Sequence, residues 1–158
     1  MIELNEVIEM RRRLHQVPEI AFDLFKTQAI LKEYLTQFGY EFEEVAQTGL
    51  VAVKKGMGDT SIAFRADMDA LAVTEKTNVD YVSLHQGNMH ACGHDGHMTV
   101  LLGFAKYLSQ KKDLKKNIVF IFQPAEEGPG GAEHIIASGI FLKYKVGRLL
   151  LTLSLYPV

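Results

Sequence analysis

The sequence is poor in cysteine, proline and tryptophan. Its 158 residues include one cysteine, four prolines and no tryptophan. A single cysteine cannot form a disulfide within the chain, and this scarcity is typical of proteins of the reducing cytosol. The sequence also contains no run of roughly 18 apolar residues, the length that a membrane-spanning helix requires. We therefore expect a cytoplasmic protein without a membrane span.

The chain also lacks an excess of charge of one sign. Its formal net charge is −2, from 17 basic and 19 acidic residues. The basic runs at 11–13 and 111–116 are short, whereas nucleic-acid-binding proteins usually carry a basic excess over a whole face. The first residues contain no apolar core of a secretory signal. These absences predict no nucleic-acid partner and no secretion.

What the sequence does contain is an alternation of helical and strand-like patterns. Apolar residues at helical spacing predict helices at 4–17, 23–39, 96–110 and 130–139. Short β-branched runs predict strands at 49–55, 60–67 and 117–123, the first two joined by a hairpin turn at 56–59. The last of these strands has an unbroken apolar run at 118–122 between two polar residues, which is typical of a strand buried on both faces. The predicted fold class is α/β, a layered mixed sheet flanked by helices.

Polar clusters follow the predicted strands. "RADMD" at 65–69 ends one strand, "QPAEEGPGG" at 123–131 ends another, and "HACGHD" at 90–95 directly precedes a helix. In open α/β sheets, binding sites lie beyond the carboxyl ends of the strands. We therefore expect the three clusters to meet at one edge of the sheet.

The cluster "MHACGHDGHM" at 89–98 contains the only cysteine and three histidines. A thiolate at Cys92 and an imidazole at His94 can reach one divalent ion if the backbone turns at Gly93. An isolated pattern of this kind is also found in sites without a metal. His90 and His97 are further donors, and each is equally compatible with a packed or hydrogen-bonded imidazole.

Four carboxylates accompany this cluster. Glu126 and Glu127 are either a solvated pair in a loop or a functional pair, in which one binds a metal ion and the other accepts a proton from water. Asp67 and Asp69 lie on one face if the strand continues through them. They are expected to hydrogen-bond histidine ligands or to cap the next turn. The pattern assigns no role to His15.

The stretches "RRRLHQVPE", "FRADMDAL", "MHACGHDGHM" and "QPAEEGPGGAE", in this order and spacing, resemble a known family. It is the metal-dependent amidohydrolase family that includes hippurate hydrolase, the auxin-conjugate hydrolases and N-acetyldiaminopimelate deacetylase. "GNMHACGHD" running on to "EEGPGGAE" is most similar to the deacetylase branch. The resemblance extends from residue 11 to about residue 140 and so covers most of the chain.

The resemblance implies the N-terminal part, over 1–145, of a zinc-peptidase-like catalytic domain without its lid domain. It implies one or two divalent ions, manganese, cobalt or zinc, and hydrolysis of a small N-acyl amino acid in lysine and diaminopimelate biosynthesis. It also allows a homodimer in full-length relatives, which is not expected to be preserved in this chain. By position, the metal ligands are Cys92, His94 and Glu127. Glu126 matches the general base, a role that another assignment gives to Glu127, and Asp67 matches an active-site aspartate.

The sequence departs from the family pattern at its end. Members of the family are more than twice as long, and two further histidine ligands are expected in them. One of these aligns with Ser154, and the other has no counterpart. The segment 146–158 is either a divergent strand or a truncated tail, and its apolar run at 149–155 has no evident partner strand. The alternative to an enzyme is therefore an inactive remnant with at most weak metal binding. A structural zinc module is disfavoured, because such sites are rich in cysteine.

Overall fold

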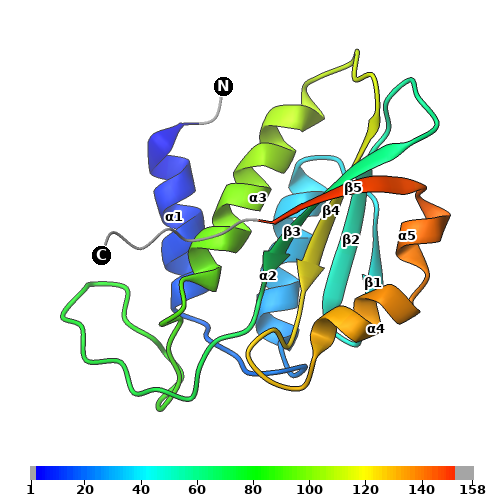
Figure 1. The fold of residues 1–158 in the computed structure, drawn as a ribbon. Helices are drawn as coiled ribbons and strands as arrows, with labels where there is room; N and C mark the ends of the chain where they lie inside the picture. Colours follow the sequence, from blue (N-terminus) through cyan, green and yellow to red (C-terminus); the bar gives the residue numbers. More distant parts are fainter. Residues whose placement is uncertain (1–2, 152–158) are drawn as a thin grey trace, which may run out of the picture.

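A five-stranded mixed sheet forms the centre of the computed structural model, which describes residues 3–151 (Figure 1). The strands are β1 (Phe42–Val45), β2 (Gly49–Lys54), β3 (Ser61–Asp67), β4 (Asn117–Gln123) and β5 (Val146–Leu151). The helices are α1 (Leu4–His15), α2 (Phe25–Gln37), α3 (His94–Ser109), α4 (Gly131–Ala137) and α5 (Ile140–Lys143). This arrangement confirms the predicted α/β class. None of the helices in the described part of the chain is long and apolar enough to cross a membrane.

The sheet has the order β1-β2-β4-β3-β5. β4 pairs with β2 in the antiparallel sense and with β3 in the parallel sense, and its residues from Ile118 onward are buried. The strand predicted at 117–123 is therefore buried on both faces, as expected. The predicted hairpin between β2 and β3 is wrong, because β4 lies between them. The chain forms its hairpin between β1, which the sequence pattern did not indicate, and β2.

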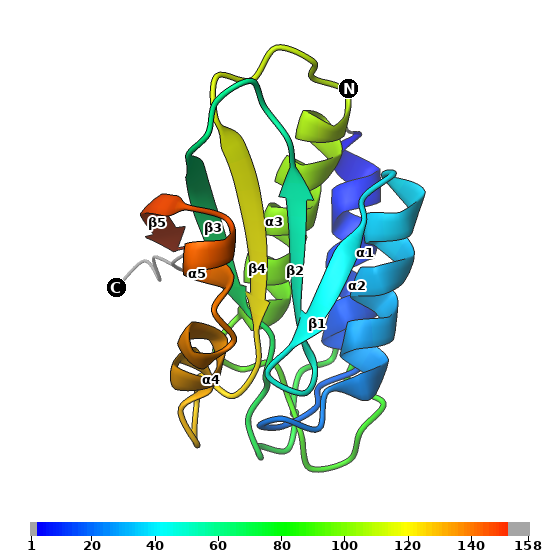
Figure 2. The same cartoon turned by 90° about the vertical axis from the view of Figure 1, so that its right-hand side faces the viewer.

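Helices cover both faces of the sheet (Figure 2). Side chains from α1, α2 and α3 pack on one face against alternate residues of β2 and β4, including Leu50, Phe120 and Phe122. On the other face, Ile135 of α4 and Ile140 at the start of α5 pack against the intervening residues, such as Val51. The alternation of side chains along each strand explains why neighbouring residues belong to different clusters.

Helix α3 begins earlier than its sequence pattern indicated. It starts at His94, so the second half of the histidine cluster belongs to the helix and not to the loop before it. The buried face of this helix includes Met98, Leu101 and Leu108, whereas Val100 is exposed.

The end of the described chain joins the sheet. Val146–Leu151 pairs in parallel with the outer edge of β3. The expectation that this apolar run has no partner is wrong for these residues, since the edge of β3 offers backbone groups that need hydrogen bonds. Leu149, Leu150 and Leu151 remain between 41% and 49% exposed. Ser154 lies outside the described residues.

Candidate metal centre

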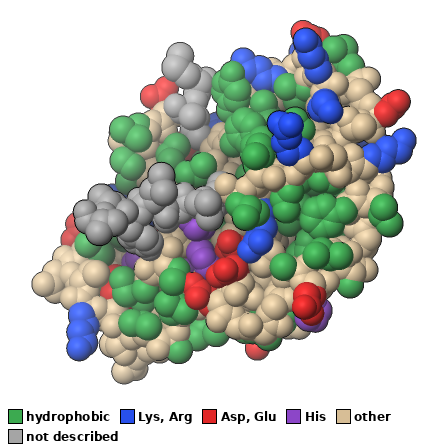
Figure 3. All heavy atoms as spheres, viewed as in Figure 1, with side chains coloured by type: hydrophobic (Ala, Val, Ile, Leu, Met, Phe, Trp, Pro, Cys, Tyr) green, Lys and Arg blue, Asp and Glu red, His purple; other side chains and the backbone are tan. Residues whose placement is uncertain are grey.

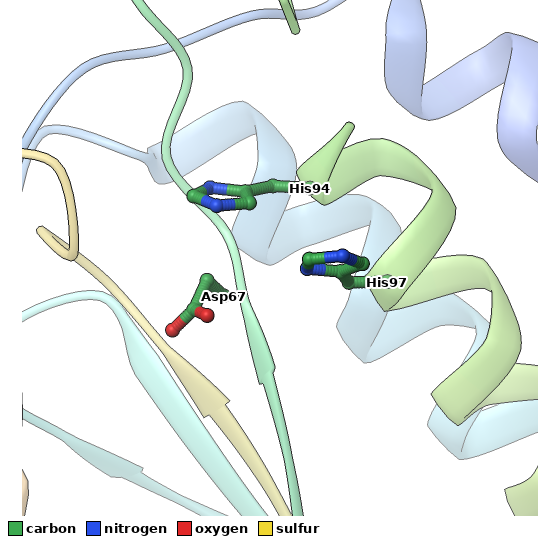
Figure 4. Close-up of side chains that lie close together, drawn as sticks. All are labelled: Asp67, His94 and His97. Carbon is green, nitrogen blue, oxygen red and sulfur yellow. The ribbon is translucent and has the colours of Figure 1, made fainter. Parts of the chain in front are cut away.

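The three polar clusters come together at one edge of the sheet, as the sequence predicts. β3 and β4 are parallel and end in register, with Asp67 opposite Gln123. Met68 continues the ladder through a hydrogen bond of 2.9 Å from its N–H to the carbonyl of Gln123. The first turn of α3 lies beside this edge, so its side chains reach the end of β3 (Figure 4).

The start of α3 aligns two histidines. Gly93 precedes the helix with a φ of 80°, a left-handed conformation that glycine adopts at little cost. Residues three apart lie on the same side of a helix, and the ring centroids of His94 and His97 are 5.3 Å apart. Figure 4 shows both rings close to the side chain of Asp67, at the end of β3.

Within the described residues, the side-chain atoms that can bind a metal gather in two groups. One consists of Asp67, His94 and His97, and the other of His94, Glu126 and Glu127, with the ligand atoms of each group within 4.8 Å of one another. His94 is common to both groups. Figure 3 shows histidine and acidic side chains next to one another on this face of the molecule. The arrangement offers two adjacent positions for a cation.

The orientation of His94 suits a ligand. Its Nδ1 lies 2.8 Å from the backbone carbonyl of Asp69, so Nδ1 carries the hydrogen and donates it. Nε2 is then the free lone pair, and it lies 3.9 Å from a carboxylate oxygen of Glu126 and 3.9 Å from one of Glu127. A hydrogen bond that fixes one ring nitrogen and leaves the other for the metal is the usual arrangement of histidine ligands.

The loop after β4 is held in a constrained shape that presents the two glutamates. Ala125 has a φ of 55°, which is unusual for a residue with a side chain. The N–H of Gly131 donates to the carbonyl of Ala125, and a Cβ at Gly131 would lie 1.7 Å from the carbonyl oxygen of Pro124. The loop closes only because this position has no side chain. Its tip is tied by a 2.9 Å hydrogen bond from the N–H of Glu127 to Asp69 Oδ2.

Several carboxylates lie close together at the site and shift the pKa values of its residues. Burial, followed by the charges of Asp67 and Glu127, raises the pKa of Glu126. Burial and the neighbouring carboxylate of Glu127 raise the pKa of Cys92 to about 11. Burial of Asp69 acts to raise its pKa, but the hydrogen bonds that it accepts from His94 and from backbone amides outweigh burial and lower it. A cation would relieve the repulsion between these acids.

The residues present fit a divalent cation, because imidazole nitrogens and carboxylate oxygens converge on the same positions. Of the predicted ligands, His94 and Glu127 lie together, and the predicted base Glu126 lies with them. Cys92 belongs to neither group of ligand atoms within the described residues, although its thiol lies next to Glu127. Its role as a ligand stays a prediction. Ser154, the position of a further expected ligand, lies outside the described chain.

The sequence leaves the roles of two residues of the site open: His97 is a further donor or a packed imidazole, and Asp69 is expected to hydrogen-bond a histidine ligand or to cap a turn. His97 joins Asp67 and His94, and the signal that identifies it is its position three residues after His94 in a helix that begins at His94. Asp69, not Asp67, is the aspartate that holds His94 and Glu127. Asp67 instead accepts a 2.9 Å hydrogen bond from Nε of Arg65 and lies close to the two histidines.

Comparison with known proteins identifies the family. Residues 63–154 match the model of peptidase family M20/M25/M40. The chain belongs to this family. It is 46% identical over 145 residues to the N-acetyldiaminopimelate deacetylase of Listeria monocytogenes serotype 4b, an alignment that covers 90% of the chain and 39% of the relative. The resemblance inferred from the four motifs is thereby confirmed.

Solved structures of the family share the fold. A dinuclear metal-binding peptidase of family M20 from Bacillus subtilis superposes with a TM-score of 0.88 at 38% identity, over 93% of this chain and 42% of that one. A putative aminohydrolase from methicillin-resistant Staphylococcus aureus gives 0.82 at 35% identity, over 93% and 40%. The chain thus spans about two fifths of the length of the relatives that it matches.

Proposed function

We propose that the chain carries part of the active site of a metal-dependent amidohydrolase that cleaves the amide bond of an N-acyl amino acid. The substrate we propose is N-acetyldiaminopimelate or a close analogue, in lysine and diaminopimelate biosynthesis in the cytoplasm. The observation that carries the proposal is the position of His94 Nε2, 3.9 Å from a carboxylate oxygen of Glu126 and 3.9 Å from one of Glu127. The name of the Listeria relative supports the choice of substrate.

A divalent cation bound here would supply a Lewis acid that polarises the amide carbonyl and makes water more acidic. His94 and Glu127 would hold it, with Cys92 as a third ligand. Glu126, the more exposed of the two glutamates, would accept a proton from the attacking water at a carboxylate oxygen. It would then return that proton to the nitrogen of the leaving amine. Asp69 would keep His94 and Glu127 in place.

The types of ligand atom indicate which metal ions suit the site. Imidazole nitrogen and carboxylate oxygen suit manganese, cobalt and zinc, and a thiolate at Cys92 would favour zinc. The two ligand groups share His94, whose single free nitrogen binds one ion, so the described residues by themselves support one ion. The dinuclear metal-binding peptidase from Bacillus subtilis supports a second ion, which would need further ligands.

The alternative is an inactive remnant with at most weak metal binding. It is favoured by one observation within the described residues, that each of the two groups of ligand atoms contains three side chains. In that case the ligands described here would be too few to hold a cation firmly.

Calorimetric titration of the purified chain with Zn²⁺ and Mn²⁺, followed by an assay of acetate release from N-acetyldiaminopimelate, tests the proposal. Stoichiometric binding tighter than about 1 μM, together with acetate release that a chelator abolishes, is the expected result. Tight binding without hydrolysis would reduce the proposal to metal binding alone. Absence of both would support the remnant.

A further inference from the structure

A second buried network lies on the other side of the first turn of α3. His15, the last residue of α1, is 5% exposed. Its Nδ1 lies 2.7 Å from Asp95 Oδ2, and its Nε2 lies 3.2 Å from Glu75 Oε1. Asp95 is fully buried and directly follows His94 in the chain. The network therefore reaches within one residue of the metal centre, although none of its side chains belongs to the two ligand groups.

The charges of this network complement one another. Both ring nitrogens of His15 face carboxylates, which only accept hydrogen bonds, so both nitrogens carry hydrogen and the ring is an imidazolium. Asp95 Oδ2 also accepts a 3.2 Å hydrogen bond from Arg11 Nε. Each of the buried acids thus has a cationic partner, and the pair of acids would be costly to bury without His15.

The network joins three parts of the chain. Asp95 accepts a 2.8 Å hydrogen bond from the N–H of Gly96 at the start of α3. Glu75 accepts one of 2.6 Å from the N–H of Ser83, which folds the segment between β3 and α3 back on itself. His15 supplies the link from these two points to α1. Because His15 and Asp95 are 80 positions apart, the contact exists only in the folded chain.

We propose that His15 is a positioning residue for the metal centre, which fixes the first turn of α3 through Asp95 and so sets the place of His94. The segment between β3 and α3 is held to the same point through Glu75. The effect on a metal rests on the function proposed above, whereas the effect on the helix start does not. His15 itself touches neither the ligand groups nor the proposed base.

A cavity of about 380 Å³ beside His15 makes the proposal testable by rescue. It is lined by His15 and by Glu75, Tyr81, His90 and Asp95. The His90 ring is 3% exposed, and neither of its nitrogens has a hydrogen-bond partner among the described residues. The cavity is open to a small solute, so free imidazole can enter the space that His15→Ala would leave.

The test compares His15→Ala with Met10→Ala, a substitution of a fully buried residue in the same helix. Both variants loosen α1, but only the first removes the link to Asp95. Cobalt is titrated into each chain, and its visible spectrum is recorded at saturation. For His15→Ala we expect a loss of Co²⁺ affinity of about tenfold or more and a changed spectrum. Because imidazole also binds Co²⁺, each chain is compared with the wild type at the same imidazole concentration, and there both properties of His15→Ala should approach those of the wild type. Met10→Ala should keep the wild-type spectrum with and without imidazole.

If the wild-type chain binds no Co²⁺, that result counts against the proposed function alone. The role of His15 is then tested by amide hydrogen exchange, which needs no metal. The amides of Gly96 and His97 should then exchange faster in His15→Ala than in Met10→Ala, and imidazole should slow them. If His15→Ala does not fold, Glu75→Gln takes its place, because glutamine keeps the shape of the side chain. The Glu75→Gln chain should show the same changes in Co²⁺ affinity, spectrum and amide exchange, but smaller ones. Wild-type affinity and spectrum in His15→Ala, or equal exchange at Gly96 and His97 in the two variants, would overturn the proposal.

Discussion

The backbone N–H of Glu127 donates a 2.9 Å hydrogen bond to Asp69 Oδ2, across 58 positions of the chain. Asp69 also accepts the Nδ1 hydrogen of His94 through its own backbone carbonyl. One buried residue after β3 therefore holds a residue of the loop after β4 and a residue of α3. The two proposed ligands that lie together are placed by the same aspartate.

Replacement of this aspartate should loosen the site. In Asp69→Ala we expect the metal affinity to fall by about 10- to 100-fold, the range typical of groups that orient ligands. The reason is that Glu127 loses the acceptor that fixes its backbone. Calorimetric titration with Zn²⁺ measures the change, and Asp113→Ala, in the loop before β4, serves as the control. An Asp69→Ala chain with unchanged affinity would show that the loop holds its shape without this bond.

Glu126→Gln should separate binding from chemistry. The amide cannot accept a proton from water, so we expect hydrolysis to fall by about 10²- to 10⁴-fold. Metal binding should be spared if Glu126 is the base and not a ligand. The two outcomes are read from an acetate-release assay and from calorimetry on the same protein. Retained turnover would assign the base to another residue, and a large loss of affinity would make Glu126 a ligand.

Cys92→Ala and His97→Ala test two candidate ligands in parallel. If Cys92 binds the metal as its position in the family implies, its replacement should lower the affinity for zinc more than the affinity for manganese, because thiolates prefer the softer ion. If His97 completes a site with Asp67 and His94, its replacement should lower the stoichiometry or the affinity for both ions. An unchanged titration in either variant would remove that residue from the site.

Gly131→Ala should destabilise the fold. The new methyl group would lie 1.7 Å from the carbonyl oxygen of Pro124, and forcing a close-packed backbone apart costs about 1–3 kcal/mol. Gly128→Ala is the matched control in the same loop, because a Cβ there meets nothing within 4 Å, and it should change the free energy of unfolding by less than about 0.5 kcal/mol. Urea denaturation of both variants measures the difference, and equal stabilities would contradict the expectation.

The stability of the protein should depend on pH through His15. The hydrogen bond to Asp95, aided by the one to Glu75, raises the pKa of His15 against the effect of burial. A group whose pKa is raised by folding stabilises the folded state fully below its unfolded pKa, here 6.5, and loses that contribution as the pH rises through the folded value. The free energy of unfolding should therefore fall as the pH rises above about 6.5.

The acids of the same network make the stability of the protein depend on pH in the opposite sense, at low pH. For both Asp95 and Glu75 the effect of burial is outweighed by hydrogen bonds, which include those from His15, and each pKa is lowered. Their contribution is lost as the pH falls through the folded values. Urea denaturation across the pH range checks both sides. His15→Gln should give a flatter profile above about pH 6, and a profile as steep as that of the wild type would rule out His15 as the source.

Much of the fold follows from local patterns. The spacing of apolar residues predicts α1 and α2, and the unbroken apolar run at 118–122 predicts a strand buried on both faces. The polar clusters after β3 and β4 predict the edge where the site lies. These features depend on residues near one another in the chain, so the sequence reveals them directly.

Other features depend on contacts between distant residues. The sequence did not indicate that β4 separates β2 from β3, because strand order is decided by the burial of whole strands and not by the turn between two of them. It gave no role to His15, whose partner Asp95 is 80 positions away. The sequence by itself determined which chemistry the chain carries, through the types and spacing of its histidines and acids. Only the tertiary structure decided that His97 and Asp69 lie at the centre and that His15 is tied to its edge, because hydrogen bonds between distant segments form when the chain has folded.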